Sequence, residues 1–423
     1  MRRALCLRVV RIVPASRTQL AQAAAALLLV VAGVGVWLEQ PEPPARRIAA
    51  TASGRPPAYA PAPVRPDKPP PRAFQADLDR LAESFPGDVG VAVFDVNDGW
   101  IAAYQGDRPF PQQSVSKVWV AVGLLDEVDR GQIDLSRSLT IQRQDLSVFS
   151  EPIQALVKPT YTTTLDDLLV RAIRDSDNAA NDLLIRTAGG VRRIQGILAA
   201  KGVDGVRLGM DEKHLQSVIN GLEWRPEYAG TSALSLARAR LPLALREATL
   251  ANYVSHPQDG ATPKGTVEGL AALSEGKLLS PPSTQKLLGI MDKVRTGRHR
   301  LKGGLERGWM LAHKTGTGPD LRGASVGIND VGLLTAPDGH LYAVAVFIAR
   351  THAATPERLA FMQKVSELVE ARWSGGPGPA IGGPARAEPL LTAAPTVRGR
   401  AHHRRHARRA AKAKASHGRR HRH

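Results

Sequence analysis

The stretch VGVAVFDVNDGWIAAY, residues 89–104, decides the fold class of this chain. Its two halves, residues 89–94 and 100–104, alternate and are rich in β-forming residues, and an Asn-Asp-Gly turn joins them. Far along the chain, VGLLTAPDGHLYAVAVFI, residues 331–348, has the same layout around a Pro-Asp-Gly turn. The two hairpins predict one antiparallel sheet that is assembled from both ends of a domain.

The residues between and around these hairpins predict helices. Residues 73–84 carry apolar side chains at helical spacing, a long helical stretch begins at Ser114, and residues 356–373 have the pattern of a closing helix. We therefore expect an α+β domain over residues 73–374, in which an antiparallel sheet built from both ends packs with a helical subdomain.

The charge of the chain lies at its ends. The 423 residues carry a net charge of +18, but residues 1–72 hold 11 basic and 3 acidic residues, and residues 398–423 hold 11 basic and no acidic residues. The part between them, with 35 basic and 36 acidic residues, needs no polyanionic partner such as nucleic acid. The single cysteine, Cys6, excludes an internal disulfide. No cysteine and histidine spacing indicates a zinc site, so we expect no metal and no cofactor.

Three terminal segments are predicted to lie outside the domain. In residues 1–38, five arginines precede an apolar run over residues 20–38, which indicates a signal peptide or an anchor in the inner membrane. This charge order predicts export to the periplasm or another extracytoplasmic space. Residues 39–72 read as a Pro/Ala-rich linker. Residues 375–423 read as a disordered tail, rich in arginine and histidine, that adds solubility or adheres to peptidoglycan or another anionic envelope surface.

Three short motifs carry the chemistry. Residues 114–117, SVSK, form an S-x-x-K motif that at a helix start places serine and lysine one turn apart on one face. A lysine of lowered pKa can take the proton of such a serine. Ser274 and Ser283 begin further copies, which we interpret as surface residues. What distinguishes the first copy is that it precedes both SDN, at residues 176–178, and KTG, at residues 314–316.

In this order the motifs resemble those of the class A serine β-lactamases and penicillin-binding proteins. SDNAANDLL from Ser176 is similar to the family's helix entry, and FSEP from Phe149 is similar to the loop that carries an aromatic residue at the pocket rim. KTGTG from Lys314 is similar to the strand that borders the site. The resemblance covers about residues 73–373, and it implies the β-lactamase/transpeptidase-like fold and a small-molecule β-lactam substrate. We expect a monomer.

The resemblance implies a role for each motif residue. Ser114 would attack the β-lactam carbonyl with Lys117 as its activator, and the backbone N–H groups of Ser114 and Thr317 would form the oxyanion hole. Ser176 would relay a proton to the leaving nitrogen. The substrate-binding residues would be Phe149, Asn178, Lys314, Thr315, Gly316 and Thr317. Among them, the asparagine would bind a substrate amide and the lysine the substrate carboxylate.

A second cation is expected near that carboxylate, because a fork of donors holds a carboxylate better than one point charge does. Residues 296–304, TGRHRLKGG, are similar to family members that place this arginine there, which makes Arg300 our assignment. Arg322, shortly after the KTG motif, is the alternative.

Release of the acyl-enzyme requires a base for water. Class A enzymes use a glutamate in an E-x-x-L-N segment, and residues 212–216, EKHLQ, are similar to it except that glutamine replaces the asparagine. Glu212 is thus the expected base, with Glu223 and Glu227 as alternatives. Met210 stands where the family usually has an arginine that pins this loop, and Asp259 is the expected position of that arginine's partner.

Three functions fit the sequence. The favoured one is an exported serine hydrolase of class A β-lactamase type, which opens the β-lactam ring through a Ser114 acyl-enzyme. The alternatives are a penicillin-binding D-Ala-D-Ala peptidase or transpeptidase acting on peptidoglycan, and a non-catalytic envelope-binding protein. The intact Ser114, Lys117, Ser176, Asn178 and Lys314 argue against the last of these.

Overall fold

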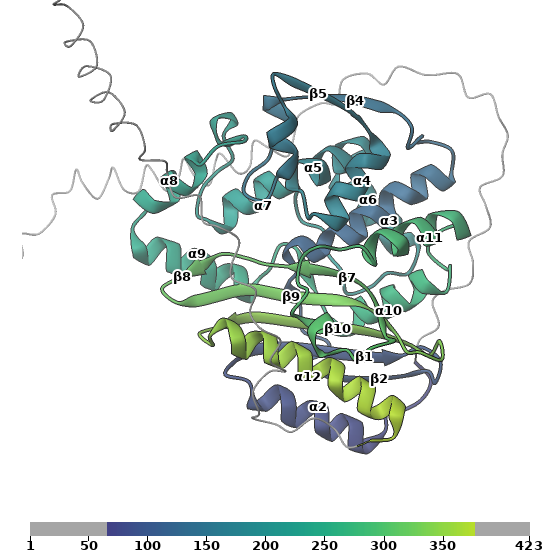
Figure 1. Ribbon diagram of the computed structural model, residues 1–423. Coiled ribbons are helices and arrows are strands. Elements are labelled where there is room, and N and C mark those ends of the chain that lie inside the picture. The colour runs from purple at the N-terminus through teal and green to yellow at the C-terminus, as the bar shows by residue number, and fades with distance from the viewer. Residues whose placement is uncertain (1–65, 377–423) are drawn as a thin grey trace, which may run out of the picture. The chain divides into compact units, whose positions relative to one another are not determined.

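The computed structural model describes residues 66–376, and this part of the chain has the α+β architecture predicted from the sequence (Figure 1). Its main sheet has the strand order β2-β1-β10-β9-β7, and β8 pairs with β9. The strands are β1 (Gly87–Asp95), β2 (Trp100–Tyr104), β7 (Met310–Gly316), β8 (Asp320–Leu321), β9 (Ala324–Thr335) and β10 (Leu341–Thr351). All of these pairings are antiparallel, and β1 joins the early strands to the late ones through β10.

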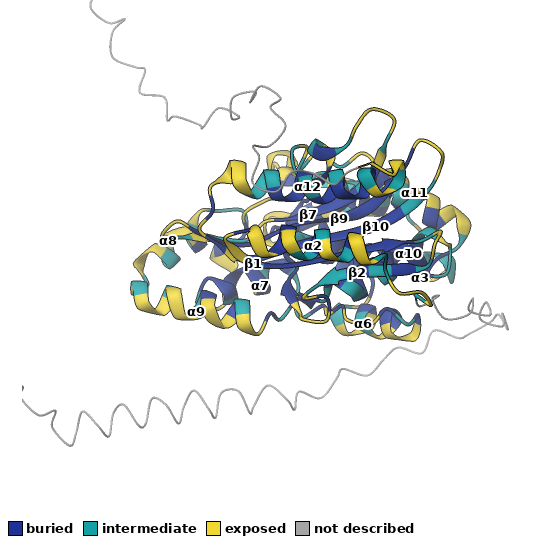
Figure 2. Ribbon diagram, turned by 90° about the horizontal axis from the view of Figure 1, so that it is seen from below, coloured by how far each residue is buried: buried dark blue, intermediate teal, exposed yellow. Residues whose placement is uncertain are grey.

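Two terminal helices cover one face of this sheet, α2 (Arg72–Ser84) and α12 (Thr355–Ser374), as Figure 2 shows. Successive side chains of a strand point to opposite faces. Val91 and Val93 of β1 accordingly pack in the cluster that contains these two helices, whereas Ala92 and Phe94 belong to the larger cluster on the other face. Both faces of the sheet are therefore buried, which explains why β10 reads as a nearly continuous apolar run.

The helical part of the domain lies against the second face and carries the SVSK motif on α3 (Ser116–Asp129). All but the last two residues of α3 are buried, so this helix runs through the core. The other helices are η2 (Gln113–Val115), α4 (Leu165–Arg174), α5 (Asn178–Thr187), α6 (Val191–Ala200), α7 (Glu212–Ile219), α8 (Ala233–Arg240), α9 (Leu243–Ser255), α10 (Pro263–Ser274), α11 (Pro281–Met291) and short 3-10 turns at 143–145, 152–156, 226–228 and 301–304.

Two small two-stranded sheets complete the fold and were not predicted. β3 (Phe110–Pro111) pairs with β6 (Gly260–Ala261), and β4 (Ser138–Gln142) pairs with β5 (Thr160–Thr164). Both are short, and their strands lie far apart in the sequence, so no local turn indicates them.

The end of the predicted linker belongs to the folded domain. The backbone N–H groups of Asp67 and Lys68 both donate to Gly99 O, at 3.2 Å. At the other end, Gly375 adopts a left-handed conformation (φ 71°) directly after α12, as glycine commonly does there. The predicted signal or anchor, residues 1–38, most of the linker, and all but the first two residues of the predicted tail, residues 375–423, lie outside the described residues. Within residues 66–376, no helix has both the length and the hydrophobicity needed to span a membrane.

Candidate active site

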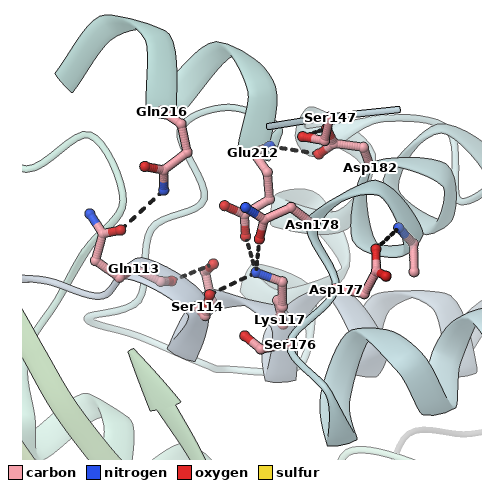
Figure 3. Close-up of polar contacts among 12 residues, drawn as sticks. Gln113, Ser114, Lys117, Ser147, Ser176, Asp177, Asn178, Asp182, Glu212 and Gln216 are labelled. Atoms are coloured by element: carbon pink, nitrogen blue, oxygen red, sulfur yellow. Dashed lines mark hydrogen bonds and ion pairs between the residues drawn. The ribbon is translucent and has the colours of Figure 1, made fainter. Parts of the chain in front are cut away.

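The SVSK motif brings a hydroxyl and an amine into direct contact. Lys117 Nζ donates to Ser114 Oγ at 2.8 Å, and the Lys117 side chain is fully buried (Figure 3). Ser114 lies in the 3-10 turn η2, one turn before Lys117 at the start of α3, so the predicted helical stretch begins with a tighter turn. The preceding Gln113 has a positive φ of 51°, a conformation that a non-glycine residue adopts at a cost.

The other two S-x-x-K copies lack this contact. Ser274 Oγ donates to Ala271 O, and Lys277 pairs with Glu275 instead. Ser283 was expected at the surface but is buried at the start of α11, where its hydroxyl donates to Asp129 at the end of α3. The order of the three motifs was therefore a better guide than the S-x-x-K pattern alone.

Two further oxygens surround the Lys117 amine. It donates to Asn178 Oδ1 at 2.9 Å and forms a buried hydrogen-bonded ion pair with Glu212 Oε1. The second carboxylate oxygen, Glu212 Oε2, is buried and accepts no hydrogen bond from any residue of the described domain. The lysine thus links the hydroxyl of Ser114 to a carboxylate that has one oxygen without a hydrogen-bond partner among the described residues.

The SDN and KTG motifs are likewise joined by a hydrogen bond from a lysine amine to a serine hydroxyl. Lys314 Nζ donates to Ser176 Oγ at 2.9 Å and to Thr315 O at 3.0 Å. Ser176 has a positive φ of 60°, and the turn that holds it is fixed by Asp177, whose carboxylate accepts from Ala180 N at 2.9 Å and from Ile153 N at 2.7 Å. Asp177 therefore caps α5 (Asn178–Thr187) and aims the residues on either side of it into the site.

The Lys314 side chain is also fully buried. Its burial, and secondly the nearby Lys117 amine, hold the pKa of Lys314 well below the usual lysine range. Glu212 opposes this shift. An anionic ligand beside Lys314 would favour its charged form, which makes the position suited to a carboxylate.

A cavity of about 310 Å³ opens above these groups. Among its lining residues are Ser114, Phe149, Asn178 and Thr317, all predicted from the sequence. The Phe149 side chain is half exposed, as expected for an aromatic residue at a rim. Asn178 uses its amide nitrogen to hold the neighbouring loop, donating to Val148 O at 2.8 Å. The predicted residues therefore share one hollow, with the Ser114 hydroxyl at its wall.

Arg300 reaches the site and Arg322 does not. The Arg300 guanidinium donates to Gly316 O at 2.9 Å, to Asn329 O at 2.6 Å and to Thr317 Oγ1 at 2.7 Å. Its pKa is lowered, chiefly by burial. Arg322 instead faces Glu247 at 3.7 Å and lines a separate groove.

The KTG strand approaches η2 closely. A Cβ on Gly316 would lie 2.3 Å from Gln112 O, so only glycine fits where β7 passes the serine turn. Thr315 is buried beside it, with its hydroxyl 2.6 Å from Thr296 Oγ1. These two residues hold the strand in place and do not line the cavity. Within residues 66–376, no group of three or more His, Cys, Asp or Glu side chains is arranged to hold a metal ion.

Asp259 lies near Met210, as the resemblance implies, and both line a small cavity beside Glu212. Because methionine offers no ion-pair partner there, Asp259 bonds elsewhere. Its carboxylate accepts from Gln113 N at 2.7 Å and from Tyr253 OH at 3.1 Å, directly beneath the serine turn. The loop before α7 is held by Asp182, which accepts from Glu212 N at 2.6 Å.

Asp182 accepts hydrogen bonds from this loop and from a second segment of the chain. Its carboxylate also accepts from Lys213 N at 3.2 Å and from Ser147 Oγ at 2.8 Å. Burial, and then the nearby Asp211 and Glu212, raise the pKa of Asp182 well above its usual range. The sequence contains this residue in the stretch after SDN, but no local pattern distinguishes its role, since the contact spans 30 residues.

Gln216, which stands where class A enzymes have an asparagine, faces the cavity and bonds back to the serine turn. Gln216 Nε2 donates to Gln113 Oε1 at 3.1 Å, and Gln113 Nε2 donates in turn to Tyr253 OH at 2.6 Å. These hydrogen bonds connect α7 to η2 and, through Tyr253, to α9. Glu223 and Glu227, the alternative bases, are exposed, and Glu227 faces Arg225 at 3.8 Å.

Burial of Asp259 predicts a pH-dependent stability. Burial is the main cause that raises the pKa of Asp259 to about 7, well above the usual range of an aspartate. The folded state therefore binds more protons than the unfolded state between about pH 4 and pH 7, so stability falls as pH rises through this window. Urea unfolding should show that the wild type loses about 3 kcal/mol more than Asp259→Asn between pH 5 and pH 8. An equal loss in both proteins would contradict the assignment.

Comparisons with known proteins agree with this geometry. A family model described as the Beta-lactamase enzyme family matches residues 73–373. Beta-lactamase VEB-1 from Pseudomonas aeruginosa is 28% identical over 289 residues, covering 68% of this chain and 84% of the relative. A solved beta-lactamase from Chitinophaga pinensis DSM 2588 is 26% identical with a TM-score of 0.60, covering 72% of this chain and 99% of that chain.

A solved ancestral class A beta-lactamase (GNCA) is 28% identical to this chain, with a TM-score of 0.57 over 71% of this chain and 99% of that one. The family match spans nearly the whole described domain, including all three motifs and Glu212. The chain therefore belongs to the beta-lactamase enzyme family, among its class A serine enzymes.

Proposed function

We propose that the protein hydrolyses β-lactams through an acyl-enzyme on Ser114. The observation that carries the proposal is the buried Lys117 amine, which contacts both the Ser114 hydroxyl and the Glu212 carboxylate. The contact with Ser114 lets the lysine accept the serine proton during acylation. The contact with Glu212 places a carboxylate beside the acyl group for its release. A penicillin-binding enzyme needs only the first, so the carboxylate favours hydrolysis.

Acylation begins when Ser114 Oγ attacks the β-lactam carbonyl carbon. The hydroxyl proton passes to the Lys117–Glu212 pair, and the backbone N–H groups of Ser114 and Thr317 stabilise the oxyanion. The carbon–nitrogen bond of the ring then breaks. The ring nitrogen takes a proton from the Ser176 hydroxyl, which Lys314 holds at 2.9 Å. The proton that the Lys117–Glu212 pair took from Ser114 then passes to Ser176, so that both groups regain their starting states.

Substrate binding follows from the positions of the cations. Arg300 contacts Thr317 Oγ1, and Lys314 stands three residues before Thr317 and contacts Ser176; together the two cations hold the carboxylate that β-lactams carry on the ring system. Asn178 presents its amide at the cavity wall for the side-chain amide of the substrate. Phe149 closes the rim with an apolar surface.

Release of the acyl group requires one water molecule. Glu212 Oε2 takes a proton from the water while the water oxygen attacks the acyl carbon. As the bond to Ser114 Oγ breaks, this proton passes from Glu212 through Lys117 to Ser114 Oγ, which restores the free enzyme. Gln216 lies at the same cavity and can orient the water through its amide, as the asparagine does in related enzymes.

A chromogenic cephalosporin tests this proposal with the purified domain, residues 66–376. We expect product in large excess over enzyme at a steady rate. A burst of one equivalent followed by a stable adduct would contradict hydrolysis and support penicillin binding. Absence of both a burst and an adduct would exclude either enzyme.

We further propose that the domain acts outside the cytoplasm, exported by residues 1–38, and that the arginine-rich and histidine-rich tail adheres to anionic envelope polymers. The five arginines before the apolar run and the absence of acids from residues 398–423 support this. Cell fractionation followed by mass spectrometry of the protein tests the location and distinguishes a cleaved signal from a retained anchor. Recovery in the cytoplasmic fraction would contradict export.

A further inference from the structure

One cation of the cavity has no role in the chemistry described so far. Arg238 lies on α8 (Ala233–Arg240) and lines the same cavity as Ser114, together with Ser235 of the same helix. The segment that carries it follows α7, which bears Glu212, and Arg238 joins this segment to the start of β8 through a hydrogen bond to Asp320 O. No motif in the sequence indicates this residue.

The Arg238 guanidinium is poorly satisfied within the protein. Its hydrogen bond to Asp320 O, at 3.2 Å, is the one that it makes within the described domain, and its buried Nε has no partner there. Among residues 66–376, no carboxylate lies within ion-pair distance of it; Asp320 attracts it only from farther away. Burial and the neighbouring Arg246 both lower the pKa of Arg238. A buried or half-buried cation of this kind gains from an anionic ligand.

Arg238 also lies away from the cations assigned to the ring carboxylate. Arg300 contacts Thr317, whereas Arg238 contacts Asp320, three residues farther along the chain. The residues that these two arginines contact, Thr317 and Asp320, stand at the two ends of a stretch whose first three residues line the cavity. A carboxylate held at Arg300 therefore leaves Arg238 free for a second anion on the same molecule.

We propose that Arg238 binds a second carboxylate, carried on the acylamino side chain of the substrate, so that the enzyme favours dianionic β-lactams. This inference rests on the proposed function. With the ring carboxylate at Lys314 and Arg300 and the reacting carbonyl at Ser114, the acylamino side chain extends past Asn178 toward the cavity wall formed by α7 and α8. Arg238 supplies the positive charge of that wall.

Benzylpenicillin and carbenicillin test the proposal, because carbenicillin is benzylpenicillin with an added carboxylate on the side chain. The quantity to measure is the ratio of kcat/KM for carbenicillin to that for benzylpenicillin. We expect this ratio to fall at least tenfold in Arg238→Gln and to fall less in Arg238→Lys, which keeps the charge. Arg246→Gln is the matched control, since this neighbouring arginine does not line the cavity, and it should leave the ratio unchanged.

The outcomes separate this proposal from the hydrolase itself. Wild-type turnover of benzylpenicillin tests the hydrolase, and the ratio tests Arg238. If Arg238→Gln lowers both kcat/KM values equally, the residue acts only by holding the turn at Asp320, and the proposal is overturned. An equal fall of the ratio in Arg246→Gln would also overturn it, because the effect would then come from the general charge of this segment. A preference that weakens with added salt in the wild type, but not in Arg238→Gln, would support it.

Discussion

Replacing Ser114 with alanine is expected to abolish β-lactam turnover and covalent labelling by a fluorescent penicillin. The serine hydroxyl is the nucleophile that Lys117 contacts at 2.8 Å, and alanine leaves no atom to form the acyl bond. Loss of a catalytic nucleophile typically lowers kcat by about 10⁴-fold to 10⁶-fold. The measurements are steady-state hydrolysis of a chromogenic cephalosporin and in-gel fluorescence after labelling.

Ser274→Ala is the matched control for this substitution. Ser274 begins another S-x-x-K sequence, but its hydroxyl donates to Ala271 O in its own helix. Both turnover and labelling should persist in this variant. Undiminished labelling of Ser114→Ala would refute Ser114 as the nucleophile.

Replacing Glu212 with glutamine is expected to separate the two halves of the reaction. The amide keeps an oxygen for Lys117 but cannot take a proton from water, so acylation continues while release slows by about 10³-fold. A chromogenic cephalosporin should then give a burst of one equivalent. Intact-protein mass spectrometry should detect an adduct that persists for minutes to hours.

Glu223→Gln provides the comparison, because this exposed carboxylate lies in the segment just after α7. It should turn over substrate as the wild type does. If Glu212→Gln hydrolyses many equivalents without an adduct, another group is the base, and the mechanism proposed for release is wrong.

The sheet was predictable because its strands carry local signals. Turn residues such as Asn97-Asp98-Gly99 and the alternation on either side of them act over a few positions, and the hairpin β1–β2 forms where they indicate. β3 and β6 were missed because each has two residues and pairs with a partner about 150 residues away. Such pairings depend on the packed domain and not on local propensity.

The site, like the sheet, was predictable where the sequence carries a recognisable motif and was not where a contact joins distant segments. The order of the SVSK, SDN and KTG motifs predicted which side chains meet, and resemblance to a family predicted Glu212. The contact between Lys117 and Glu212 spans 95 residues, and no periodicity indicates it. Asp182 and Arg238 escaped prediction for a physical reason, since an aspartate that accepts from a distant loop and an arginine that lines a cavity look like ordinary surface residues in a sequence.

The pairing of β1 with β10 has a consequence for how the protein is made. Val91 lies opposite Val346, so the middle of the sheet joins positions 255 residues apart. Such a high contact order makes folding slow, and the ribosome must release almost the entire domain before β1 finds its neighbour. The nascent chain therefore lacks this pairing for most of its synthesis. A product truncated before β10 would leave one edge of β1 unpaired, and an exposed apolar edge of this kind is prone to aggregation.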